Sequence, residues 1–171
     1  GVYDPLLAIA LCLETKVQSI ALCSVDHLGF TYEMAEKVKL LVREAIGPVE
    51  IYIGSSHTHS GGGAFLNIPF IGEALAGPYD PKMEKLYIEK TAEAIVAAWE
   101  CRVIAKVGIG YGQVCGLSRY RGTFPEKPNP ATDIALIKVE SKESAPLAAL
   151  FNFPLHPTVL DKNNLLFSSD F

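Results

Sequence analysis

The sequence predicts an α/β domain in which a mixed β-sheet is layered against flanking helices. Short apolar runs bounded by polar or glycine residues are typical of strands, and two longer segments repeat their apolar residues with a helical period. Adjacent runs with the spacing of a hairpin, followed by runs with a helix between them, favour a mixed sheet over a purely parallel one. The 171 residues, 49% hydrophobic and 20% charged, suffice for one core without a disulfide framework, so residues 1–171 are expected to belong to one domain.

The first half of the chain contains a predicted hairpin, a helix and a third strand. Residues 6–15 and 18–25 are apolar runs separated by Lys16, which predicts an antiparallel pair. Thr31 is the expected N-cap of a helix that stops at Gly47, because apolar side chains between them repeat on one face. A strand over 49–53 then leads into a loop rich in serine and glycine.

The second half contains one helix and three strands. Residues 64–80 show no clean period and are expected to be an apolar loop. Asp80 and Pro81 predict the start of a helix that continues through Glu100. The apolar stripe of this helix is expected to consist of Met83, Leu86, Tyr87, Ile95, Val96 and Trp99. Strands are predicted over 106–111, 134–139 and 146–153, with a proline-rich turn or excursion over 123–130.

Charge and hydropathy argue against a nucleic-acid partner and against a membrane-spanning segment. Lys and Arg number 15 against 19 Asp and Glu, and the basic residues are dispersed, which argues against a nucleic-acid surface. The longest apolar stretch, 6–13, is far shorter than the roughly 20 residues that span a bilayer. No signal peptide is visible, but the chain does not begin with Met, so the compartment, like the oligomeric state, stays undecided.

Four cysteines are present without a C-x-x-C spacing, and buried free thiols are the expected reading. Cys12 and Cys23 lie on the two strands of the predicted hairpin. Whether they form a cross-strand disulfide depends on the strand register, which the sequence leaves open. The other two are Cys101 and Cys115.

Histidines carry the main chemical signal. His57 and His59 form an H-x-H pair at the exit of a predicted strand, where side chains two residues apart point the same way. Both can bind one metal ion, or one can bind the ion while the other acts on a substrate. The alternative is a pair of solvated loop histidines.

His156 follows another predicted strand, between Pro154 and Pro157, which restrict its backbone. Catalytic zinc usually has three protein ligands and an open water position. Spacing alone therefore suggests His57, His59 and His156, with a core histidine near a turn as the alternative for the third.

The remaining polar candidates are less specific. Asp26 either supports a metal ligand from the second shell or simply precedes the first helix, and His27 is expected at the surface. Arg121 can orient a polar substrate group or stabilise an oxyanion. Ser168 and Asp170 lack a Gly-x-Ser-x-Gly elbow, so a serine-nucleophile hydrolase has no support.

Several phrases together resemble the amino-terminal catalytic domain of the neutral/alkaline, non-lysosomal ceramidase family. They occur in the family's order and cover nearly the full length. The phrases are Val2-Tyr3-Asp4-Pro5-Leu6, Val25-Asp26-His27-Leu28-Gly29-Phe30, His57-Thr58-His59-Ser60-Gly61, Phe153-Pro154-Leu155-His156-Pro157-Thr158 and Ser168-Ser169-Asp170-Phe171.

The resemblance implies a zinc amidase that cleaves the N-acyl bond of ceramide to a sphingoid base and a fatty acid. In that family His57 and His156 match zinc ligands, while His59 matches a histidine that contacts the scissile amide. Arg121 matches a family arginine, although Tyr120 stands where asparagine is usual.

The family takes its other zinc ligands, a Glu and a Tyr, from a later part of the chain. The family domain also begins earlier and ends later than these 171 residues, so the chain is expected to be a fragment, incomplete at both ends. With two zinc ligands the isolated fragment is expected to bind metal weakly and to be inactive.

Two other functions fit the same residues. One is a zinc amidase for a different N-acyl substrate, and the other is a non-enzymatic domain with a degenerate site that binds a lipid or a partner chain. The apolar residues of the loop after the histidines can line an acyl entrance or contact a membrane surface, although core packing is the commoner fate of such residues. These residues are Phe65, Ile68, Phe70 and Ile71.

Overall fold

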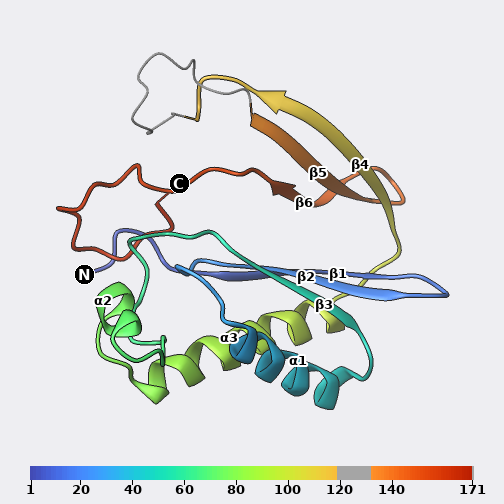
Figure 1. Ribbon diagram of the computed structural model, residues 1–171. Helices are drawn as coiled ribbons and strands as arrows, with labels where there is room; N and C mark the ends of the chain where they lie inside the picture. Colours follow the sequence, from blue (N-terminus) through green and yellow to red (C-terminus); the bar gives the residue numbers. More distant parts are fainter. Residues whose placement is uncertain (119–131, 171) are drawn as a thin grey trace. The chain divides into compact units, whose positions relative to one another are not determined.

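The computed structural model of the protein describes residues 1–118 and 132–170 (Figure 1). The chain divides into two compact units. The first consists of Gly1–Arg102 together with Pro157–Phe171, and the second of Val103–His156. The proline-rich segment 123–130 lies outside the described residues.

The first unit contains the predicted mixed sheet. Its strands are β1 (Ala8–Glu14), β2 (Ser19–Val25) and β3 (Glu50–Ser55), in that spatial order. β1 and β2 form the expected antiparallel hairpin, whereas β2 and β3 are parallel and are joined by a helix. The α/β class with a mixed sheet is thereby confirmed.

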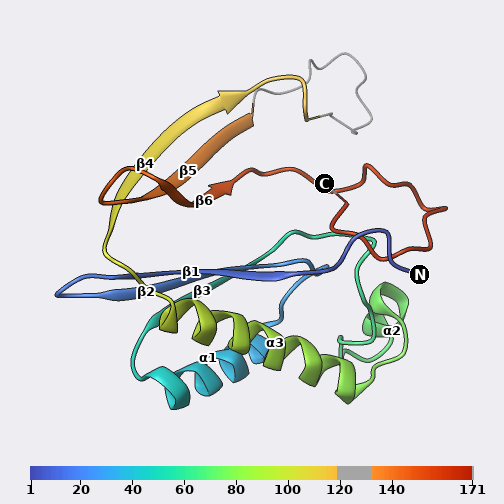
Figure 2. The ribbon, with the colours of Figure 1, turned by 180° about the vertical axis from the view of Figure 1, so that it is seen from behind.

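Two helices cover one face of this sheet, as both views show (Figures 1 and 2). The first, α1, spans Tyr32–Ile46, and the Thr31 hydroxyl accepts the Met34 N–H as the sequence predicts. The second, α3, spans Pro81–Glu100, and the Asp80 carboxylate accepts the Lys82 N–H. Both helices therefore begin at the predicted caps.

The core lies between the sheet and the two helices. It combines residues of alternate positions on β2 and β3 with one stripe of each helix, which is the pattern expected of a half-buried sheet. Its fully or nearly fully buried members are Ala21, Cys23, Val25, Met34, Val38, Val42, Val49, Ile51, Phe65, Ile88, Ala92 and Ile95.

The buried stripe of α3 agrees with the predicted one in part, because Ile95 is buried and Tyr87 and Trp99 pack against the core. Leu86 is 43% exposed, while Glu84 and Thr91 are buried. Glu84 tolerates this position because it pairs with Lys37 of α1 and accepts a hydrogen bond from the Tyr79 hydroxyl. Partners from other parts of the chain therefore allow a charged residue at a buried position of α3.

Residues 64–80 contain a short helix, α2 (Ile71–Ala76), where a loop was predicted. Six residues are too few to show a helical period. The Ala64 N–H donates to the Ala76 carbonyl at 2.6 Å, and a Cβ on Gly63 would lie 2.3 Å from the same oxygen. The close approach of the two segments therefore requires glycine at position 63.

The second unit is a separate antiparallel meander. Its strands are β4 (Ala105–Val114), β5 (Thr132–Ser141) and β6 (Pro146–Asn152), with β5 in the centre. Each strand overlaps a predicted strand and β4 and β5 extend beyond it. A bulge interrupts the β5–β6 pairing between Val139 and Glu140.

The hairpin register argues against a disulfide between Cys12 and Cys23. Cys12 lies opposite Ala21 and Cys23 opposite Ala10, so the two thiols are diagonal neighbours, and both cysteines are free. Burial raises the pKa of Cys23 to about 12, so its thiol stays protonated. Within the described part of the chain, no helix is both long and apolar enough to cross a membrane.

Truncating the core should destabilise the first unit far more than truncating the surface of the same helix. Ile95 of α3 is completely buried, so Ile95→Ala is expected to lower the free energy of unfolding by about 2–5 kcal/mol. Leu86→Ala, on an exposed position of α3, serves as the matched control and should change it little. Urea denaturation measures both, and equal losses would contradict the core assignment.

Candidate metal centre

The site begins where the parallel strands β2 and β3 end. Their pairing continues past both strands, because the Ser56 N–H donates to the Val25 carbonyl and the His57 N–H to the His27 carbonyl, each at 3.0 Å. Parallel strands end at the same edge of a sheet, and that edge is a common place for ligand sites. The segment after β2 therefore forms the support for the loop that carries the histidine pair.

His57 is held by its backbone and by its ring. Its φ of 65° lies in the left-handed region, which is unusual for a residue other than glycine and often marks a functional site. Its Nδ1 lies 2.6 Å from the Leu28 carbonyl oxygen. A carbonyl only accepts, so Nδ1 carries the proton and the lone pair is on Nε2, the arrangement that outer partners give to metal-binding histidines.

His59 lies beside His57, although the loop is not the extended segment that the sequence suggested. The two ring centroids are 5.2 Å apart and the ring planes are nearly perpendicular. Both imidazoles are exposed, while Thr58 between them is completely buried. The buried threonine thus separates two histidines that face solvent.

His156 is the last residue of the second unit and is bonded to Pro157, a fully buried residue of the first. Just beyond it the Asp170 carboxylate accepts the N–H groups of Val159 and Leu160, at 3.2 and 2.6 Å. The backbone after His156 is therefore held by the buried pyrrolidine ring of Pro157 and by the Asp170 carboxylate.

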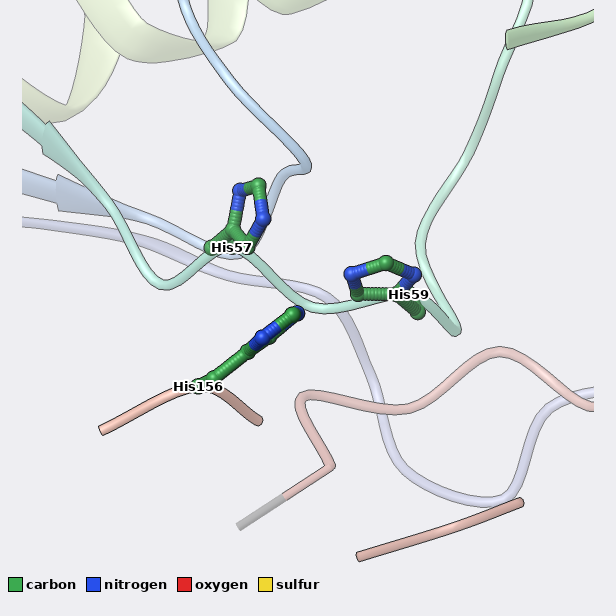
Figure 3. A group of neighbouring side chains, drawn as sticks. All are labelled: His57, His59 and His156. Atoms are coloured by element: carbon green, nitrogen blue, oxygen red, sulfur yellow. The ribbon is translucent and has the colours of Figure 1, made fainter. Parts of the chain in front are cut away.

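The three histidines form one group, shown in Figure 3. Each offers a ligand nitrogen, and these nitrogens all lie within 4.8 Å of one another. Nitrogens bound to one tetrahedral zinc ion at about 2.0–2.1 Å stand about 3.3 Å apart, which is the same range of separation. The all-imidazole donor set and the Nε2 lone pair of His57 fit a zinc-like ion.

The structure also shows where most of the remaining candidate residues lie. The Asp26 carboxylate accepts the Leu7 N–H at 3.0 Å, which ties β1 to the end of β2. Phe65 packs in the core, while Ile68, Phe70 and Ile71 are exposed. Arg121 lies outside the described residues.

The expectation that His27 lies at the surface is wrong. The side chain is completely buried and packs against the rings of Phe30, Phe65 and Tyr87. Its Nδ1 lies 2.7 Å from the Gly29 carbonyl oxygen, and its Nε2 has no hydrogen-bond partner. Burial lowers the pKa of His27, so the neutral ring is favoured. Aromatic residues far along the chain create this pocket, which local sequence does not reveal.

The sequence reasoning also missed a polar network behind the histidine pair. It contains Asp4, Thr58 and Ser168, which come from three distant parts of the chain. The sequence offered no specific signal for this network, because its members lie far apart along the chain. Hydrogen bonds from Ser168 and Ser169 lower the pKa of the Asp4 carboxyl.

Comparison with known proteins establishes the fold. No family model and no curated protein matches the sequence. A crystal structure of neutral ceramidase from Pseudomonas aeruginosa matches 99% of the chain with a TM-score of 0.86 and 18% identity, over 29% of its own length. A ceramidase complexed with C2 matches 89% with a TM-score of 0.76 and 17% identity, over 26% of its length. The chain therefore shares its fold with these two proteins, but it corresponds to less than a third of the length of each.

Burial of neutral His27 should make folding stability depend on pH. The unfolded chain binds a proton at this ring near pH 6.5 and the folded chain does so only at lower pH. The contribution of His27 is therefore complete above about pH 6.5 and is lost as the pH falls below it, by at most about 1.4 kcal/mol per pH unit.

Urea denaturation of the native protein and of His27→Leu at several pH values between about 7.5 and 5 measures this contribution. The variant should lose less stability on acidification than the native protein. Equal losses in the two proteins would show that His27 is protonated as easily in the folded state as in the unfolded one.

Proposed function

We propose that this chain is the histidine-bearing part of a zinc-dependent amide hydrolase of the ceramidase type. The observation that carries the proposal is the group of three histidines from two separate stretches of chain, with ligand nitrogens within 4.8 Å of one another. The fold shared with neutral ceramidase over 99% of the chain supports the same conclusion. Both units are then parts of one catalytic domain.

His57 and His156 are the proposed zinc ligands. The hydrogen bond from Nδ1 to the Leu28 carbonyl suits His57 to this role, because it leaves the Nε2 lone pair available to an ion. The backbone support beyond His156 suits that residue in the same way. Two ligands hold zinc weakly, so the remaining ligands are expected from the part of the protein beyond these residues.

Zinc bound there would polarise the amide carbonyl and lower the pKa of water in its coordination sphere to about 7. His59, whose ring centroid lies 5.2 Å from that of His57, would contact the substrate. A ring nitrogen of His59 would donate a hydrogen bond to the oxygen of the attacked carbonyl, or pass a proton to the leaving amine nitrogen. Arg121 would orient a polar group of the substrate.

The proposed substrate is ceramide, with another N-acyl amide as the second candidate. Ile68, Phe70 and Ile71 follow the histidine loop in sequence and are exposed, Phe70 to 93%. Exposed apolar side chains of this kind favour contact with an acyl chain or a lipid surface over contact with a small polar amide.

Metal analysis separates the proposed ligands from the substrate-facing histidine. In the full-length protein, His57→Ala and His156→Ala are expected to lose bound zinc, measured by elemental analysis after desalting. His59→Ala should keep the zinc and lower kcat by about 10²–10⁴-fold, the range of a lost general acid or base.

Lys162→Ala, an exposed position in the segment after His156, is the control and should keep both zinc and activity. Loss of zinc in His59→Ala would instead make His59 a third ligand. A native protein without zinc would contradict the proposal and favour a non-enzymatic binding domain.

Chain-length dependence tests the substrate class. A series of N-acylsphingosines should show kcat/KM rising by about fourfold for each added methylene that becomes buried, because each contributes about 0.8 kcal/mol. Hydrolysis is followed by release of the fatty acid. Cleavage restricted to short, soluble amides would leave a zinc amidase but exclude ceramide as the substrate.

A further inference from the structure

A buried hydroxyl lies directly behind the histidine pair. Thr58 is completely buried, and its Oγ1 donates to the Ser168 carbonyl at 2.8 Å. The same oxygen accepts the Ser60 N–H at 3.1 Å. Two hydrogen bonds therefore fix the one residue that links His57 to His59.

The partner of this hydroxyl is itself fixed on several sides. Ser168 is 2% exposed, and its N–H donates to the Ser60 carbonyl at 3.0 Å. Its hydroxyl donates to the Asp4 carboxylate at 2.5 Å and accepts the Asp170 N–H at 3.0 Å. The other oxygen of Asp4 accepts the Ser169 N–H at 2.7 Å.

We propose that Thr58 is a positioning residue for the histidine pair, anchored by Ser168 and, through the Ser168 hydroxyl, by Asp4. His57 has a left-handed backbone and both imidazoles are exposed, so neither ring is fixed by packing in the core. The buried Thr58 hydroxyl acts together with the Leu28 carbonyl that accepts the His57 ring N–H, since buried hydrogen bonds hold in place the backbone that links the two histidines. The proposal deepens the proposed function and rests on it for what the histidines bind.

The affinity of the full-length, metal-free protein for Co²⁺, followed by its visible absorption, tests this role. Thr58→Val keeps the volume of the side chain and removes the hydroxyl, so Co²⁺ binding is expected to weaken by about 10- to 100-fold. Thr58→Ser keeps the hydroxyl and should restore native affinity. Asp4→Asn, at the far end of the network, should weaken binding in the same direction but less.

Thr15→Val is the matched control. The Thr15 hydroxyl donates to the Gln18 carbonyl at 3.0 Å and accepts the N–H groups of Val17 and Gln18, but it lies in the turn between β1 and β2. Its removal also breaks hydrogen bonds of a threonine hydroxyl, but at an exposed position away from the histidines, and should leave Co²⁺ affinity unchanged. Thermal unfolding of each variant reports the stability lost in each case.

Native Co²⁺ affinity in Thr58→Val, together with lowered thermal stability, would make Thr58 purely structural and overturn the proposal. If Thr58→Val does not fold, native affinity in Asp4→Asn overturns the anchored network in the same way. Crystal structures of metal-free native protein and Thr58→Ser should both show the His57 and His59 rings 5.2 Å apart, whereas Thr58→Val and Asp4→Asn should show them displaced.

The two measurements separate this inference from the proposed function. A native protein that binds no Co²⁺ contradicts the metal centre, while displaced rings in Thr58→Val still support the positioning role. Undisplaced rings in that variant would overturn the positioning role whatever the metal affinity of the native protein.

Discussion

The parallel pairing of β2 and β3 is the constraint on which the candidate site depends. Helix α1 connects these strands, so both leave the sheet at the same edge. Their exits stay hydrogen-bonded beyond the last regular residue, and the segment after β2 provides the carbonyls of His27 and Leu28 that receive the backbone and ring N–H groups of His57. The core between sheet and helices thus fixes the site indirectly, by fixing the two strand ends.

The candidate site has an exposed side, with the three imidazoles, and a buried side, with the hydrogen-bonded Thr58 and Ser168. Imidazoles that bind a metal and a substrate must be accessible, so they give up the packing that orders a core residue. In the candidate site, hydrogen bonds order the backbone next to the imidazoles, and Pro157, the residue after His156, is buried. Such a division is common in sites where geometry must be maintained without covering the reacting groups.

Local signals allowed most of the first unit to be predicted from the sequence. Thr31, Asp80 and Pro81 determine where helices begin through contacts within a few residues, and the hairpin follows from alternating apolar runs. The short helix α2 and the buried face of α3 were not predictable in this way. The first has only six residues, too few for a repeat of apolar residues to be recognised, and the burial of Glu84 in the second depends on its pairing with Lys37 of another helix.

The candidate site was predictable in its residue types but not in its geometry. An H-x-H pair and a proline-flanked histidine are visible in the sequence. The resemblance to ceramidases implies that His57 and His156 are metal ligands and that His59 contacts the substrate. The left-handed backbone of His57, the burial of His27 and the support of Thr58 by Ser168 all depend on partners far along the chain. No local pattern encodes such contacts.

The separation of these partners in sequence has a consequence for biosynthesis. The partner of both Thr58 and Asp4 is Ser168, which lies 110 residues after Thr58 and 164 residues after Asp4. The helices and the hairpin, in contrast, form through contacts between residues that are close in sequence. At a translation rate of about 5–20 residues per second, the first interval alone lasts about 5–20 s. During it the nascent histidine loop has its neighbouring strands but lacks its anchor. The hydrogen-bond network that supports the candidate site is therefore completed late, only after the segment that contains Ser168 has been synthesised.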